Sequence, residues 1–119
     1  MARATVLLAH GSRDPEWRRP IEAVAARMQE LAPQAQVHCA YLELTPPDLA
    51  CVIDELALAG IAEIIIVPML LGLGRHARQD LPQRVQQLAL RHPTLALQLR
   101  PAIGEDLELI DLLARMALR

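Results

Sequence analysis

Two apolar runs, each followed by a histidine, constrain the fold of this chain most strongly. Two segments of strand length, residues 4–10 (ATVLLAH) and residues 62–68 (AEIIIVP), each consist mostly of a run of apolar residues. Continuous rather than alternating apolar residues are typical of parallel strands that are covered by helices on both faces. The first run ends in His10, and His76 follows the second run after a glycine-containing loop. The sequence therefore predicts a layered α/β fold with two histidines beyond the ends of buried strands.

Strand-like and helix-like segments alternate along the whole chain. Strands are expected at residues 4–10, 36–43, 62–68 and 94–99. Helices are expected at residues 14–33, 45–60, about 80–91 and about 105–118. The first two helices begin with residues that commonly cap helices, Asp14 before Pro15 and Thr45 before Pro46. This alternation predicts one domain, residues 1–119: an α/β three-layer sandwich around a four-stranded, mostly parallel sheet with the flavodoxin-like strand order 2-1-3-4.

Composition excludes several other classes of protein. Hydrophobic residues make up 53% of the 119 residues, which is enough for a single core. The net charge of −2 argues against a nucleic-acid binder that neutralises phosphates. No signal-peptide pattern and no apolar run of about 20 residues is present, so no membrane association is expected. The two cysteines, Cys39 and Cys51, lack CxxC spacing, which fits a reducing, cytoplasmic location.

The predicted topology brings three side chains to one rim of the sheet. His10 and Glu43 lie at the carboxyl ends of neighbouring strands, and His76 lies in the loop after the next strand. Ligands of such folds bind outside the carboxyl ends of the strands, where the strand order reverses. Two histidines and a carboxylate can bind a divalent first-row metal or act as acid–base catalysts near neutral pH. A single histidine after a strand is more often a loop residue with a local hydrogen bond, and Glu43 alone could lie in a solvated turn.

Polar residues near the two histidines indicate an anionic ligand. Five arginines flank the two histidine-bearing segments, which suggests a collar for carboxylates, although a solvated surface is the simpler interpretation: Arg13, Arg18, Arg19, Arg75 and Arg78. Ser12 lacks the surroundings of a nucleophile and is expected to make loop hydrogen bonds. Gly72 and Gly74 would allow unusual backbone angles or the close approach of a large flat ligand. They form no phosphate-binding motif, which disfavours nucleotide binding.

Three segments, LLAHGSRDPEW, YLELTPPDL and VPMLLGLGRHARQDLP, together resemble the small sirohydrochlorin chelatases, the short class II chelatases of the cobalamin and siroheme pathways. The resemblance covers nearly the whole chain, and its first and third segments are the more specific. It implies a chelatase-like fold and an enzyme that inserts Co²⁺ or Fe²⁺ into sirohydrochlorin, a tetrapyrrole with eight carboxylates. The metal is then a substrate, and no organic cofactor is implied.

The resemblance also implies roles for individual residues. His10 and His76 match the two histidines that handle the metal, and Glu43 matches an acidic residue that assists catalysis. Ser12, Arg13, Gly74, Arg75 and Arg78 are expected to contact the tetrapyrrole. A non-enzymatic carrier of a tetrapyrrole or a divalent metal is the alternative function.

A homodimer is expected for two reasons. The chain has about half the length of two-domain relatives whose site lies between similar halves, so a second copy would complete the site. The C-terminal helix is expected to carry two apolar rows, of which one faces the sheet and the other contacts the second copy: Leu107, Ile110, Ala114 and Ala117 in one row, Leu109, Leu112, Leu113 and Met116 in the other.

Overall fold

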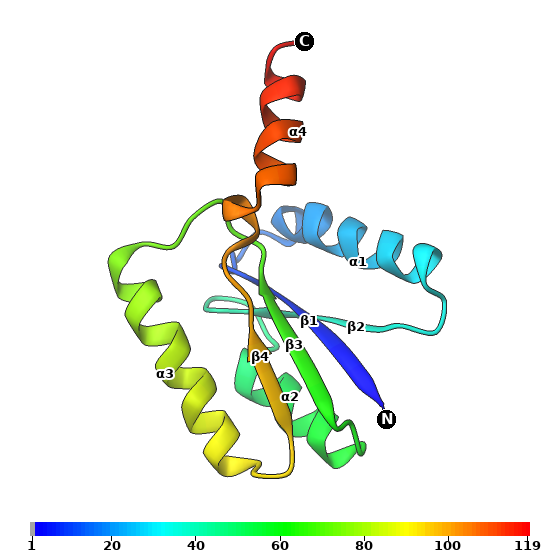
Figure 1. Cartoon of the computed structure of the whole chain (residues 1–119), viewed down its shortest axis with the longest axis vertical. Helices are drawn as coiled ribbons and strands as arrows, with labels where there is room; N and C mark the ends of the chain where they lie inside the picture. The colour runs from blue at the N-terminus through cyan, green and yellow to red at the C-terminus, as the bar shows by residue number, and fades with distance from the viewer. Residues whose placement is uncertain (1) are drawn as a thin grey trace.

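A four-stranded parallel sheet lies at the centre of the computed structural model, which describes residues 2–119 (Figure 1). The strands are β1 (Arg3–Ala9), β2 (Gln36–Tyr41), β3 (Glu63–Pro68) and β4 (Ala96–Leu99). Their order is β2-β1-β3-β4, and every neighbouring pair is parallel. The predicted strand order and fold class are therefore confirmed.

Helices connect the strands and end the chain. The α-helices are α1 (Arg19–Leu31), α2 (Leu49–Leu58), α3 (Arg75–Arg91) and α4 (Leu107–Ala117), and the short 3-10 helices are η1 (Pro15–Arg18) and η2 (Ile103–Glu105). Asp14 caps η1 as predicted, because its carboxylate accepts a hydrogen bond from the backbone of Glu16 at 3.0 Å. None of the helices within residues 2–119 is long and apolar enough to cross a lipid bilayer.

The two faces of the sheet pack against different helices (Figure 1). Val6 and Leu8 of β1 belong to a core with α2 and α3, whereas Leu7 and Ala9 belong to a second core with α1. All four side chains are buried. This explains why the strand is an unbroken apolar run: both of its faces are covered. The layers of the predicted sandwich are therefore present, although α4 belongs to none of them.

Helix α3 begins earlier than predicted. It starts at Arg75 rather than near Asp80, so His76 lies in the first helical turn and not in a loop. Asp80 and Pro82 resemble a helix start in the sequence, yet Pro82 lies inside the helix. The proline removes one backbone hydrogen bond there. The apolar packing of Leu81, Val85 and Leu88 accompanies this uninterrupted helix.

Helix α4 projects away from the body of the molecule (Figure 1). None of its residues, all within the described part of the chain, is buried. The prediction that one of its apolar rows packs on the sheet is therefore wrong. Nor do other elements of the described chain cover the two rows. Large apolar side chains on both rows, such as Ile110, Leu113 and Met116, are 47%, 38% and 48% exposed.

Candidate active site

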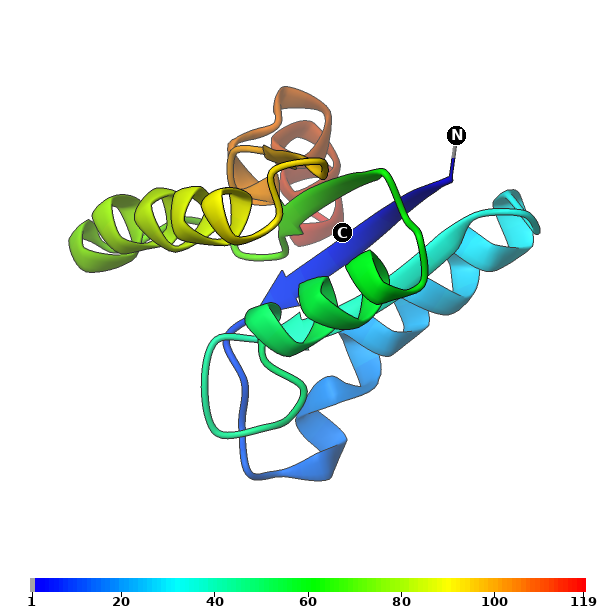
Figure 2. The same ribbon diagram turned by 90° about the horizontal axis from the view of Figure 1, so that it is seen from below.

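The loops after β1 and β2 are tied to each other by backbone hydrogen bonds. The amide of Leu42 donates to the carbonyl of Ala9, and the amide of Glu43 donates to the carbonyl of His10, both at 2.9 Å. The Thr45 hydroxyl donates to the carbonyl of Ser12. Figure 2 shows the two loops running side by side. The parallel pairing of β1 with β2 thus continues past the end of the sheet and holds His10 beside Glu43.

Thr45 does not cap α2 as predicted. Asp48 is the capping residue, because its carboxylate accepts a hydrogen bond from the backbone of Cys51 at 2.8 Å. This hydrogen bond also holds the pKa of Asp48 below its usual value. Residues 42–46 instead form a bent loop, with Leu44 at φ 65°, in which the Thr45 hydroxyl bonds to the first loop rather than to α2.

Gly11 allows the close contact between these loops. Its φ is +105°, a conformation that residues with a Cβ rarely adopt. A Cβ built at this position would lie 1.7 Å from the carbonyl oxygen of Glu43. Glycine is therefore required directly after His10, for its backbone angle and for the space. The sequence pattern His-Gly alone does not show this requirement.

His76 reaches the same region from the other side. The loop between β3 and α3 begins with the Met69 amide donating to the carbonyl of Leu8 at 2.7 Å, and α3 follows with Gly74 as its N-cap. Gly74 has φ −65° and ψ 166°, angles that any residue can adopt, so its backbone conformation does not require glycine. Open space surrounds both Gly72 and Gly74, because a Cβ at either would meet no atom within 4 Å.

His10, Glu43 and His76 line one hollow of about 520 Å³, a volume in the range of small-molecule sites. All three side chains are exposed to solvent. The remaining walls come from α3 and from the end of β2: Leu42, Ala77, Gln79, Asp80, Leu81, Gln83 and Arg84. The strands β1 and β2 and the helix α3 thus present two imidazoles and two carboxylates to one opening.

Five residues expected at the site do not line this hollow: Ser12, Arg13, Gly74, Arg75 and Arg78. Ser12 makes the expected loop hydrogen bond, since its hydroxyl accepts from the Asp14 amide at 3.1 Å. Arg13, Arg75 and Arg78 are exposed and lie close in the sequence to His10 or His76.

The hollow is not a closed metal site. Within residues 2–119, no group of three or more His, Cys, Asp or Glu side chains is arranged to hold a metal ion. His10 and His76 can nevertheless each offer a ring nitrogen to a metal or accept a proton, and the carboxylates of Glu43 and Asp80 can offset positive charge.

The other two histidines have structural positions. His92 caps the far end of α3, and its Nε2 lies 2.6 Å from Oδ1 of Asp54. Arg91 contacts both oxygens of the same carboxylate, at 2.8 and 2.7 Å. The hydrogen bonds with His92 and Arg91 hold the pKa of Asp54 below its usual value. His38 lies in β2, as expected for a histidine within a strand.

Sequence comparison identifies the family. The sequence model of the CbiX family matches residues 4–118. The chain belongs to the CbiX family.

Curated relatives of this CbiX-family chain are named as chelatases. It is 32% identical over 80 residues to the sirohydrochlorin cobaltochelatase of Methanopyrus kandleri, which covers 67% of this chain and 56% of that protein. It is 26% identical over 110 residues to the sirohydrochlorin ferrochelatase of Bacillus subtilis, covering 92% of this chain and 42% of that protein. The chain thus spans about half the length of curated relatives that it matches.

Solved structures share the fold. The structure described as a cobalamin biosynthesis CbiX protein from Marinobacter aquaeolei VT8 has a TM-score of 0.81 and 30% identity, covering 98% of this chain and 93% of that chain. The sirohydrochlorin chelatase SirB from Bacillus subtilis subspecies spizizenii, in complex with cobalt, has a TM-score of 0.80 and 25% identity. The match covers 98% of this chain and 50% of that SirB chain.

Proposed function

We propose that this CbiX-family protein inserts a divalent metal, Co²⁺ or Fe²⁺, into sirohydrochlorin. The observation that carries the proposal is the placement of His10, Glu43 and His76 around one hollow in a chain of this family. Its relatives are named as cobaltochelatases and ferrochelatases, which supports the reaction type and leaves both metals as candidate substrates. Two imidazoles and a carboxylate suit both metals.

The residues around the hollow match what metal insertion requires. The cation must lose part of its water shell, and two protons must leave the pyrrole nitrogens as the metal enters the ring. Neutral imidazoles of His10 and His76 can hold the cation through ring nitrogens and can accept protons. The carboxylate of Glu43 can offset the charge of the cation or relay a proton. Solvent reaches all three side chains, so protons can leave to bulk water.

The exposed residues beside the hollow are proposed as contacts for the tetrapyrrole. Arg13, Arg75 and Arg78 would form charged hydrogen bonds with its carboxylates. Ser12 and the open backbone around Gly74 would contact the flat ring at closer range. Salt should weaken these contacts, because screening acts strongly on exposed charges.

The test is a change in the absorbance of sirohydrochlorin when Co²⁺ or Fe²⁺ is added with and without the protein. An insertion rate above the spontaneous rate is expected for the wild type, and His10→Ala and His76→Ala should each lose most of it. Both residues are exposed and lie outside the core, so both variants should fold. His92→Ala, at the opposite end of α3, is the matched control and should keep the rate.

The alternative function, a carrier of tetrapyrrole or metal, gives a different result in the same assay. A carrier would bind sirohydrochlorin and shift its spectrum without exceeding the spontaneous rate of insertion. Normal rates in both His10→Ala and His76→Ala would remove these residues from the mechanism.

We also propose that the active form is a homodimer in the cytoplasm. The hollow is open to solvent, so a second copy would supply the wall that a large flat substrate needs on its other face. The exposed apolar rows of α4 support a self-contact, because an apolar surface of this kind usually marks an interface. Cys39 and Cys51 are free thiols, which persist in a reducing compartment.

A further inference from the structure

A second hollow opens beside the histidine-lined one, between α2 and α3. It has a volume of about 230 Å³. Three residues, Leu42, Leu81 and Arg84, line both hollows, so the two adjoin. Arg84 lies at their junction. It is the only arginine that lines the histidine hollow among the residues 2–119.

Arg84 extends along the same ridge of α3 as the residues of the first hollow. His76, Asp80 and Arg84 follow one another at intervals of four residues, which places them on one ridge of a helix. Arg84 is eight residues beyond His76, a rise of about 12 Å along the axis. A large flat ligand centred at the histidines would therefore extend its edge toward Arg84.

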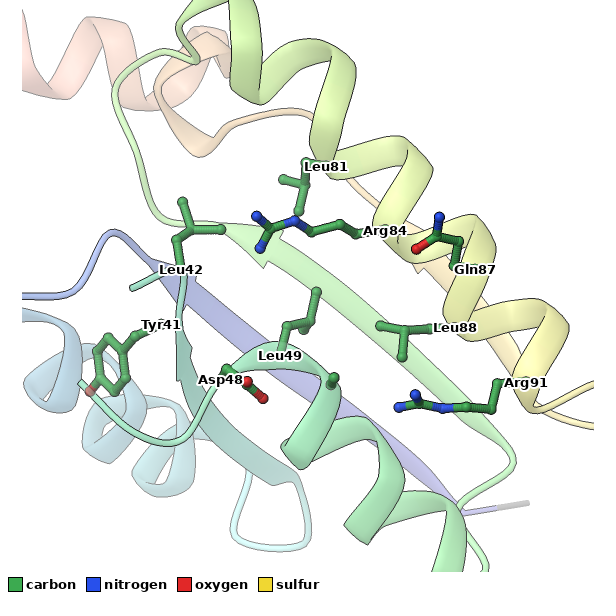
Figure 3. A pocket seen from close by; sticks show the side chains of 10 residues that line it. Tyr41, Leu42, Asp48, Leu49, Leu81, Arg84, Gln87, Leu88 and Arg91 are labelled. Atoms are coloured by element: carbon green, nitrogen blue, oxygen red, sulfur yellow. The ribbon is translucent and has the colours of Figure 1, made fainter. Parts of the chain in front are cut away.

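The second hollow has an apolar surface with charged groups at its borders. Figure 3 shows Arg84 reaching from α3 across the opening toward Leu42, with Leu49 and Leu88 beneath it. Asp48 at the start of α2 and Arg91 on α3 border the opening from its two sides. This combination of methyl-lined surface and guanidinium suits a flexible arm of CH₂ groups that ends in a carboxylate.

Of the two arginines that line this hollow, Arg84 is the one that can bind a ligand carboxylate. Its Nε lies 2.7 Å from Oδ2 of Asp80, and the two side chains are 53% and 54% exposed. An exposed pair of this type contributes little to stability, and a guanidinium has four further N–H donors on its terminal nitrogens. Arg91, in contrast, already contacts both carboxylate oxygens of Asp54.

We infer that the hollow between α2 and α3 is the subsite for one carboxylate-bearing side arm of the tetrapyrrole, and that Arg84 binds its carboxylate. The inference rests on the proposed function, because it takes the substrate from it. The arm's CH₂ groups lie on Leu42, Leu81 and Leu88, and Arg84 holds the edge of the ring through the arm's carboxylate. Arg84 is thus a residue for substrate affinity and specificity, separate from the groups that handle the metal.

The test measures binding and turnover separately. Metal-free sirohydrochlorin is titrated against the protein to obtain Kd, and insertion of Co²⁺ is then followed to obtain kcat and KM. Arg84→Ala should raise Kd and KM at least about tenfold, the effect of losing a charge-assisted hydrogen bond, and should leave kcat nearly unchanged. Arg27→Ala is the control: Arg27 also pairs with an acidic neighbour, Glu30, but lies on α1.

A second pair of variants tests the hollow itself. Gln87 lines it, whereas Gln86, one residue earlier on the same helix, does not, and both are exposed. Gln87→Phe should fill the hollow and raise Kd, while Gln86→Phe should bind like the wild type.

The outcomes separate this inference from the function on which it rests. Unchanged Kd in both Arg84→Ala and Gln87→Phe, with normal insertion by the wild type, overturns the subsite and leaves the chelatase intact. A wild type that binds but does not insert overturns the chelatase, and a raised Kd in the two variants then still supports the subsite. A wild type that does not bind sirohydrochlorin at all overturns both.

Discussion

Replacing Gly11 with alanine would place a methyl group where the backbone of Glu43 lies. The new Cβ would be 1.7 Å from the Glu43 carbonyl oxygen, and contacts under 3.0 Å are essentially never found, so the two segments must separate by the difference, about 1.3 Å. That movement would disrupt two hydrogen bonds between the loops, from the Glu43 amide to the His10 carbonyl and from the Thr45 hydroxyl to the Ser12 carbonyl. Each contributes about 1 kcal/mol. Backbone strain at φ +105° adds about 1–3 kcal/mol for alanine. The expected loss of stability is therefore about 3–5 kcal/mol.

Gly60→Ala is the matched control, because Gly60 also has a positive φ, +85°, but a Cβ there would meet no atom within 4 Å. It should lose only the strain of a left-handed alanine, about 1–2 kcal/mol. The free energy of unfolding of both variants is measured by urea denaturation with linear extrapolation. In the insertion assay, Gly11→Ala should also lower the rate, since His10 and Glu43 are displaced together, whereas Gly60→Ala should not.

An equal loss of stability in the two variants would refute this reasoning. It would show that separating the loops does not measurably lower the free energy of unfolding. The contact between Gly11 and Glu43 would then not be what holds the two loops together.

Three further changes have defined outcomes. Glu43→Gln should lower kcat for metal insertion more than it raises the Kd of sirohydrochlorin; an unchanged kcat would leave Glu43 without a chemical role. Light scattering at micromolar concentration should give twice the 13.2 kDa mass of the chain. Leu113→Asp on α4 should give a monomer, whereas Leu58→Asp, at an exposed position of α2, should remain a dimer. An active wild-type monomer would contradict the dimer. The pKa of Asp54 is lowered in the folded state, so its contribution to stability is present above the ordinary aspartate pKa and is lost as pH falls through the lowered value. Asp54→Asn should therefore be less stable than the wild type near neutral pH, by a small amount because the Asp54 side chain is 41% exposed. The difference in the free energy of unfolding should disappear in acid. A difference that is constant with pH would exclude this ion pair as its cause.

The sheet and the meeting of the three site residues were predictable because they depend on patterns of short range. An unbroken apolar run such as residues 64–68 is typical of a strand that is buried on both faces in a parallel sheet between helices. Once the strand order follows from that, the ends of β1 and β2 must be neighbours, and His10 and Glu43 come together. Their roles in catalysis do not follow from the placement and stay proposals.

The start of α3 and the position of Arg84 depend on more than local pattern. A proline is normally found in the first turn of a helix, but Pro82 lies inside α3. The packing of Leu81 and Val85 in the core explains why the helix continues through it. The spacing of His76, Asp80 and Arg84 could have identified Arg84, provided that the helix had been extended back to residue 75. The need for Gly11 could not be predicted, because it arises from the backbone of Glu43, which is distant in the sequence.

The isolation of α4 has a consequence for how the chain folds. The helix has 11 residues, and an isolated helix of fewer than about 12–15 residues is marginal in water, because helix nucleation is costly. The cap from Asp106 to the Glu108 amide, at 2.8 Å, and the ion pair of Arg115 with Asp111 offset only part of that cost. In the proposed dimer, α4 would be stabilised by the surface against which it packs, because none of its own residues is buried in the core. Coil-to-helix conversion of α4 and association would then be one equilibrium, so that the helical content of the molecule depends on its concentration.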